Sequence, residues 1–142
     1  MLGFPTLIAL HSVGMAVVVG ISLMVTLRLN GIITAISAPL VPRLLTVAVW
    51  GFGLNLLTGL ALFITRGPEY IESGIFVLKM GLVLVSASIL FWLRRYLLAT
   101  APPTETKLAG RFARGMAAAA TAAWFGAVVT GRLIAYLSSL YR

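Results

Sequence analysis

Four apolar segments, each long enough to cross a lipid bilayer, occupy most of this 142-residue chain. A helix needs about 20 residues to cross a hydrocarbon core of roughly 30 Å, and a window of that width finds all four. They run over Thr6–Leu27, Leu44–Ile64, Gly74–Trp92 and Gly115–Leu137. A transmembrane barrel would instead need alternating stretches of about ten residues, which are lacking here. The sequence therefore predicts an all-α fold, with residues 1–142 forming a single antiparallel bundle of four transmembrane helices.

Basic residues are distributed unevenly between the connections. Those between the first and second spans, and between the third and fourth, are Arg28, Arg43, Arg94, Arg95, Lys107, Arg111 and Arg114. The connection between the second and third spans holds one Arg against Glu69 and Glu72. Because cytoplasmic loops are enriched in Lys and Arg, we expect both termini on the outer side, which is the periplasm for a bacterial inner-membrane protein. Met1–Leu10 lacks the basic segment of a signal peptide, so we expect the first span to be retained.

The region before the fourth span is expected to contact lipid headgroups. Pro102 and Pro103, followed by Thr104 as an N-cap, predict that the fourth helix begins near residue 104 on the cytoplasmic side. Three cations then share one face of this helix at i, i+4 and i+7: Lys107, Arg111 and Arg114. Such a face binds anionic headgroups. Topology thus explains most of the net charge of +8, and no nucleic-acid partner is expected.

Small residues predict where the helices approach one another closely. They are Gly14, Gly20 and Ser22 in the first span, Gly51, Gly53 and Gly59 in the second, and Ala117–Ala123 with Gly126 in the fourth. In the second span, Gly51, Asn55 and Thr58 follow i, i+4, i+7 spacing. This polar stripe is predicted to face protein and to form interhelical hydrogen bonds.

The ionisable residues within the spans are His11, Lys79 and Arg132. Each lies about five or six residues from the outer end of its span, a depth of roughly 7 Å at the helical rise per residue. Arg66 and Tyr136 are expected near the same layer. An ionisable group at such a depth is costly unless a partner meets it. The five residues therefore predict an outer-leaflet site for an anion or acceptor, such as a haem propionate, a quinone oxygen or a lipid phosphate. Alternatively, the Lys and Arg side chains extend to the interface without binding a ligand.

Two metal-based versions of this site are open. Haem b held by two histidines needs a second imidazole, and the chain contains only His11, so Met15 or a partner chain would supply the other ligand. Copper is the other version, because His11 and Met15, with Met80 as a further candidate, form a soft nitrogen and thioether set. Packing alone also explains membrane methionines. The absence of cysteine excludes thiolate sites.

Catalytic patterns are missing from the sequence. No carboxylate lies within a span, and there is no His pair, nucleophile elbow or glycine-rich phosphate loop. The centres of the four spans carry no charge, which disfavours an ion pathway through one protomer. These features indicate a protein that is not an enzyme.

Five short runs resemble a family of uncharacterised small bacterial four-helix integral membrane proteins: HSVGMAVVVG, LRLNG, TGLALF, FVLKMGLV and TGRLIAYL. The resemblance covers nearly the whole chain and implies that His11, Arg28, Lys79 and Arg132 occupy motif positions. Asn30 departs from the family's Leu-Arg-Leu-Leu-Gly pattern. The chain is more distantly similar to the membrane domains of copper-resistance D proteins, which implies outer-side redox or copper biology.

Three functions follow as hypotheses. The first is a non-catalytic inner-membrane protein that binds a cofactor, or assists electron transfer, through the outer-leaflet site. The alternatives are a structural subunit of a larger membrane complex without its own cofactor, and copper handling. Besides the bilayer, the expected partners are further copies of the chain or the subunits of such a complex.

A faint internal similarity links the two predicted hairpins. Arg66 and Tyr70 close the second span at i, i+4 spacing, as Arg132 and Tyr136 close the fourth. Each pair follows a nearby Thr, although at different offsets. A duplicated hairpin would produce such a pattern.

Overall fold

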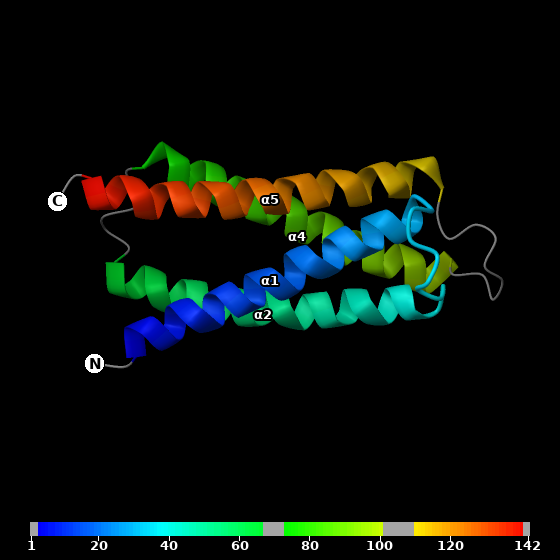
Figure 1. Ribbon diagram of the computed structural model, residues 1–142, viewed down its shortest axis with the longest axis horizontal. Coiled ribbons are helices and arrows are strands. Elements are labelled where there is room, and N and C mark those ends of the chain that lie inside the picture. Colours follow the sequence, from blue (N-terminus) through cyan, green and yellow to red (C-terminus); the bar gives the residue numbers. More distant parts are fainter. Residues whose placement is uncertain (1–2, 67–72, 101–109, 141–142) are drawn as a thin grey trace.

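The computed structural model describes residues 3–66, 73–100 and 110–140, and they form four long helices joined by short connections. The helices are α1 (Gly3–Leu29), α2 (Leu40–Arg66), α4 (Gly74–Thr100) and α5 (Arg111–Leu140). They run antiparallel, and both termini lie at the same end of the bundle (Figure 1). Each helix is long and apolar enough to cross a membrane. The predicted all-α, four-helix transmembrane bundle is thus confirmed, and the chain is a multi-pass membrane protein.

The helices extend beyond the predicted spans, because apolarity marks only the part of a helix that crosses hydrocarbon. α2 begins at Leu40 rather than Leu44, and α4 continues to Thr100. The predicted N-cap, Thr104, lies outside the described residues. In the described part, α5 begins at Arg111, and the Arg114 backbone N–H donates to the Gly110 carbonyl over 3.2 Å.

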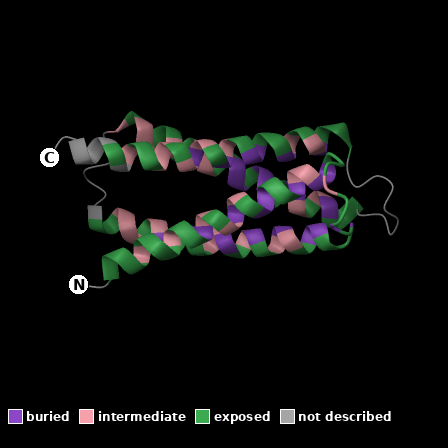
Figure 2. Ribbon diagram, in the orientation of Figure 1, coloured by how far each residue is buried: buried purple, intermediate pink, exposed green. Residues whose placement is uncertain are grey.

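The bundle consists of two tightly packed hairpins that meet over a smaller area. α1 packs along α2 and α4 along α5, while α1–α5 and α2–α4 contacts join the hairpins. The hairpins diverge towards the end that carries the termini (Figure 1). Buried residues are concentrated in the middle and towards the α1–α2 connection (Figure 2). They include Val18, Ile21, Val25, Leu29, Val41, Leu45, Ala48, Leu90, Leu93, Leu97, Ala113, Ala117 and Trp124.

Backbone contact between α1 and α2 depends on glycine. A Cβ atom on Gly14 would lie 2.9 Å from the Gly51 carbonyl oxygen, and one on Gly51 would lie 2.8 Å from Val17 Cγ1. Close approach is therefore confirmed at these two glycines. The prediction of close helix approach is wrong for Gly20 and Gly53, where a Cβ would meet nothing within 4 Å. Both lie on faces turned away from the neighbouring helices.

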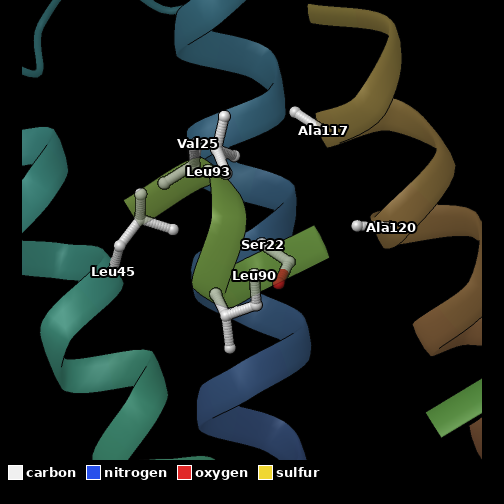
Figure 3. A pocket seen from close by; sticks show the side chains of 7 residues that line it. All are labelled: Ser22, Val25, Leu45, Leu90, Leu93, Ala117 and Ala120. Carbon is white, nitrogen blue, oxygen red and sulfur yellow. The ribbon is translucent and has the colours of Figure 1, made fainter. Parts of the chain in front are cut away.

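The half of the bundle towards the α1–α2 connection is the more densely packed one, since most of the buried residues lie there. One small void of about 10 Å³ lies where the four helices meet, and Figure 3 shows its walls. Its lining residues are Ser22, Val25, Leu45, Leu90, Leu93, Ala117 and Ala120. A void of this size is at the lower limit for holding one water molecule.

Arg28 anchors the connection between α1 and α2. Its side chain is buried, and Nε donates a hydrogen bond to the Ile36 carbonyl. α1 ends at Leu29, and Gly31 in the turn that follows has a φ of 77°, which suits glycine, with its N–H bonded to the Arg28 carbonyl over 3.1 Å. Arg28 thus satisfies a backbone carbonyl that the short connection would otherwise leave unpaired.

Candidate functional site

A cavity of about 550 Å³ lies towards the end of the bundle that carries the termini, where the two hairpins diverge. All four helices contribute to its wall, which is apolar apart from a few side chains. Its volume falls within the range of sites for cofactors and small ligands, roughly 300–1,000 Å³. The polar and ionisable side chains that line it are His11, Asn55 and Lys79.

His11 is held in one orientation by α2. Its Nδ1 lies 3.0 Å from the Asn55 carbonyl oxygen and 3.1 Å from Thr58 Oγ1. A carbonyl oxygen only accepts, so Nδ1 carries the proton and donates. The Thr58 hydroxyl donates in turn to the Leu54 carbonyl over 2.7 Å, which leaves its oxygen free to accept from His11. In the neutral ring Nε2 is therefore an acceptor with an available lone pair, and it has no hydrogen-bond partner among the described residues.

The bond to Thr58 confirms the predicted interhelical hydrogen bonding for that residue of the stripe on α2. Asn55 takes part only through its backbone carbonyl, and its Oδ1 is buried without a hydrogen-bond partner among the described residues. The His11 ring also lies directly against Gly59. A Cβ atom on Gly59 would be 3.0 Å from His11 Cε1, closer than side chains normally pack. Glycine at this position therefore makes the space in which the imidazole sits.

Lys79 reaches the same cavity from α4. Its side chain is half-buried, and a Cβ on Gly131 of α5 would lie 3.4 Å from Nζ. Lys79 faces the same cavity as the His11 ring, from the opposite hairpin. The described ranges contain no acidic residue, since Glu69, Glu72 and Glu105 all fall outside them. Within the described part of the chain, Lys79 is thus a cation in an apolar wall without a carboxylate partner.

The two methionines of the copper hypothesis, Met15 and Met80, also line this cavity with His11. The structure therefore brings the nitrogen and thioether donors of that set to one space. Among the described residues there is no group of three or more His, Cys, Asp or Glu side chains suited to a metal ion. A metal here would depend on His11 and thioether sulfur, a set that favours Cu(I).

The remaining residues of the predicted outer layer lie elsewhere. Arg132 and Tyr136 have exposed side chains and are absent from the cavity wall. Arg66 ends α2, and its side chain is outside the described part. On α5 it is Gly131 and Ile134 that face the cavity, and successive helical residues point about 100° apart. Of the three ionisable span residues, the structure brings together His11 and Lys79, and the role of Arg132 stays a prediction.

The predicted headgroup-binding cations are only partly described. Arg111 is exposed at the start of α5. Arg114 is half-buried, and its Nε is enclosed without a hydrogen-bond partner in the described residues. Lys107 lies outside them. Lipid contact by this face stays a prediction.

Sequence reasoning missed the aromatic lining of the cavity. Its phenylalanines are Phe4, Phe52, Phe63 and Phe76. Phe63 and Phe76 stack with their ring centroids 5.7 Å apart and their planes 17° apart. The signal was present in the sequence, since these two residues sit at matching heights on either side of the second connection. Spans that are apolar all round, however, do not reveal which face a phenylalanine occupies.

No protein-family model, curated protein or solved structure matches this chain. What the sequence and structure establish is a small four-helix membrane protein with a cavity between its two hairpins.

Proposed function

We propose that this protein is a non-catalytic membrane protein that binds a lipid-soluble cofactor with an oxygen-bearing head, of the quinone class, and assists electron transfer. The observation that carries the proposal is the cavity itself. Its wall is apolar and aromatic, and the two ionisable groups that face it, His11 and Lys79, sit on opposite hairpins. A few polar groups that orient a ligand within an apolar wall are typical of cofactor sites.

Access from the bilayer supports this class of ligand. Three cavity-lining leucines are also exposed on the outside of the bundle: Leu56 by 57%, Leu60 by 56% and Leu84 by 67%. Leu56 and Leu60 belong to α2 and Leu84 to α4, so part of the cavity wall is exposed on the sides of these two helices. In a transmembrane bundle that surface faces lipid, which suits a ligand dissolved in the membrane rather than in water.

We further propose the bacterial inner membrane as the location, with the cavity in the outer leaflet and a redox partner in the same membrane. The uneven basic connections support this orientation. The resemblance to small bacterial membrane proteins and to copper-resistance D membrane domains stays a hypothesis that fits it.

Orientation is directly testable. A reporter fused after Arg142 is expected to be active in the periplasm, and the same reporter inserted at Pro102 is expected to be active in the cytoplasm, because the basic connections stay inside. Alkaline phosphatase and green fluorescent protein fusions measure the two sides. Reversed signals would place the cavity in the inner leaflet.

One observation favours a second candidate, a haem b or copper ion bound by Nε2 of His11. Metal-bound histidines almost always donate their other ring N–H to a carbonyl or carboxylate, as His11 does to the Asn55 carbonyl. For haem, Lys79 is then placed to pair with a propionate. For copper, Met15 and Met80 lie in the same cavity.

Purification separates these possibilities. We expect protein isolated in mild detergent to retain an organic-extractable quinone, identified by mass spectrometry. His11→Phe and Lys79→Met should each lower its occupancy about tenfold, since each removes one polar anchor. Arg95→Met is the matched control, because it removes an exposed cation from the opposite end of α4. Far-UV circular dichroism checks that every variant is folded.

The other results are equally informative. A Soret band, or copper by elemental analysis, that disappears in His11→Phe would replace the quinone with the metal-based candidate. Colourless, metal-free protein that carries only bulk phospholipid would favour a structural subunit without a cofactor.

A further inference from the structure

The two hairpins match each other at many of their buried positions. A constant offset relates α1 to α4, and a second constant offset relates α2 to α5. Between α1 and α4 the paired buried positions are Val18 with Ser86, Ile21 with Ile89, Ser22 with Leu90, Val25 with Leu93 and Leu29 with Leu97. Between α2 and α5 they are Val41 with Ala113, Leu45 with Ala117, Ala48 with Ala120 and Asn55 with Ala127. At these positions each hairpin buries the same helical face.

Contacts between equivalent positions reveal the axis that relates the hairpins. Phe52 and Trp124 are equivalent, and their rings are in contact with centroids 5.9 Å apart. The small void in Figure 3 is lined by three equivalent pairs: Ser22 with Leu90, Val25 with Leu93, and Leu45 with Ala117. Two copies of one position meet in this way only beside a two-fold axis. The hairpins are therefore parallel repeats about an axis that runs along the bundle.

Two hydrogen bonds between the hairpins start from equivalent positions on α1 and α4, although their partners on α5 and α2 are not equivalent. Thr26 Oγ1 lies 2.9 Å from Thr121 Oγ1, which joins α1 to α5. Arg94 occupies the position on α4 that is equivalent to Thr26, and its Nε donates to Thr46 Oγ1 on α2 over 3.0 Å. This register differs from the one suggested by Arg66 and Arg132.

When the two hairpins are aligned by their paired buried positions, His11 and Lys79 are equivalent residues. Each lies against a glycine that follows a threonine, His11 against Gly59 and Lys79 against Gly131. The repeat therefore places one polar side chain from each hairpin in the cavity, on opposite sides of the axis. The two groups have complementary chemistry, since His11 in its neutral form offers the Nε2 lone pair and Lys79 offers N–H donors.

We infer that one ligand lies across this axis and is held at both ends, and that it is the reduced, hydroquinone form of a 1,4-quinone. One ligand hydroxyl donates to His11 Nε2, and the oxygen at the opposite end of the ring accepts from the Lys79 ammonium. This inference rests on the proposed function and adds the oxidation state and the orientation of the head.

The phenylalanine side chains of the cavity wall favour a hydroquinone ring over a phospholipid headgroup. A flat ring packs against the phenylalanine side chains, whereas a phosphodiester carries its charge at one point and has no planar face. The oxidised quinone lacks a hydroxyl, so its carbonyl oxygen would face the His11 lone pair without a proton between them. A missing donor of this kind is penalised because a buried acceptor is left unpaired.

The test compares four related compounds that carry a short alkyl tail. They are the hydroquinone, its quinone, its mono-methyl ether and its dimethyl ether. Binding to the full-length protein in phosphatidylcholine nanodiscs is measured by anaerobic calorimetry. We expect the hydroquinone to bind about tenfold more tightly than the quinone. The mono-ether keeps one hydroxyl and an opposite acceptor, so it should bind like the hydroquinone, and the dimethyl ether should lose the preference.

Two variants assign the ends of the ligand. His11→Phe should abolish the difference between hydroquinone and quinone. Lys79→Met should weaken the binding of hydroquinone and of quinone about equally, because both ligands present an oxygen to the ammonium. Lys79→Arg should restore much of the affinity for both ligands. Arg95→Met is the control for loss of charge.

Equal affinity for hydroquinone and quinone in the parent protein, or a preference that survives His11→Phe, would overturn the inference. If all four compounds fail to bind while the purified protein retains haem, copper or an added phosphatidylglycerol, the hydroquinone inference is wrong. The cavity would then be a binding site for a different ligand. If the isolated protein retains no quinone and binds none of these probes, the proposed function fails as well.

Discussion

Gly14→Leu is expected to lower the melting temperature by roughly 10 °C. The new side chain would start 2.9 Å from the Gly51 carbonyl oxygen, which is backbone and has no rotamer through which to move away. α1 and α2 would have to separate along their whole contact. Overpacking of this severity costs about 3 kcal/mol, and each kcal/mol shifts the melting temperature by about 3 °C in a chain of this length.

Gly20→Leu on the same helix is the matched control. A Cβ there meets nothing within 4 Å, so the substitution adds apolar surface that faces lipid. Melting in detergent, followed by tryptophan fluorescence, measures both variants. Equal melting temperatures for the two would show that α1 and α2 do not pack through Gly14.

Gly59→Leu is expected to lower cofactor occupancy at least tenfold while the fold is retained. Its side chain would start 3.0 Å from His11 Cε1, push the imidazole from its place on α2 and fill part of the cavity. Both the polar anchor and the space for the ligand would be lost. A tenfold change corresponds to about 1.4 kcal/mol, which is less than the loss of one buried hydrogen-bond partner often costs.

Gly53→Leu provides the comparison for Gly59→Leu, because it lies on the same helix and has open space around its Cβ position. Occupancy is measured by extraction and mass spectrometry of protein purified in parallel. Retention of the ligand by Gly59→Leu would place the ligand outside this cavity.

The fold was accessible from the sequence because bilayer thickness fixes the length of a spanning helix. Four apolar spans of that length leave one secondary structure and an antiparallel path. The rotation of each helix was not accessible. Gly14 and Gly20 look alike in a sequence, but one faces α2 and the other faces away from its neighbours. A helix that is apolar all round carries no polar face from which to read that difference.

The candidate site was likewise predicted in its depth but not in the directions of its side chains. Depth can be counted along a helix, so His11 and Lys79 were found at one level of the membrane. The direction in which a side chain points from its helix cannot be read from the sequence in the same way. Arg132 follows a cavity-lining glycine by one residue, and its side chain is exposed and absent from the cavity wall. Arg66 with Tyr70 and Arg132 with Tyr136 suggest one register for a repeat, whereas the burial of both helices supports another. In the register supported by burial, Thr58-Gly59 aligns with Thr130-Gly131.

The packed half and the hollow half of the bundle have a consequence for how this protein tolerates substitution. Side chains that hold the two hairpins together, such as Leu45, Leu93 and Trp124, are separate from most of those that line the cavity. Substitutions around the cavity are therefore expected to alter its shape and polarity at little cost to folding. The two polar positions occupied by His11 and Lys79 belong to different hairpins, so each can be changed without the other. Other pairs of side chains at these two positions would give the same scaffold a cavity of different polarity.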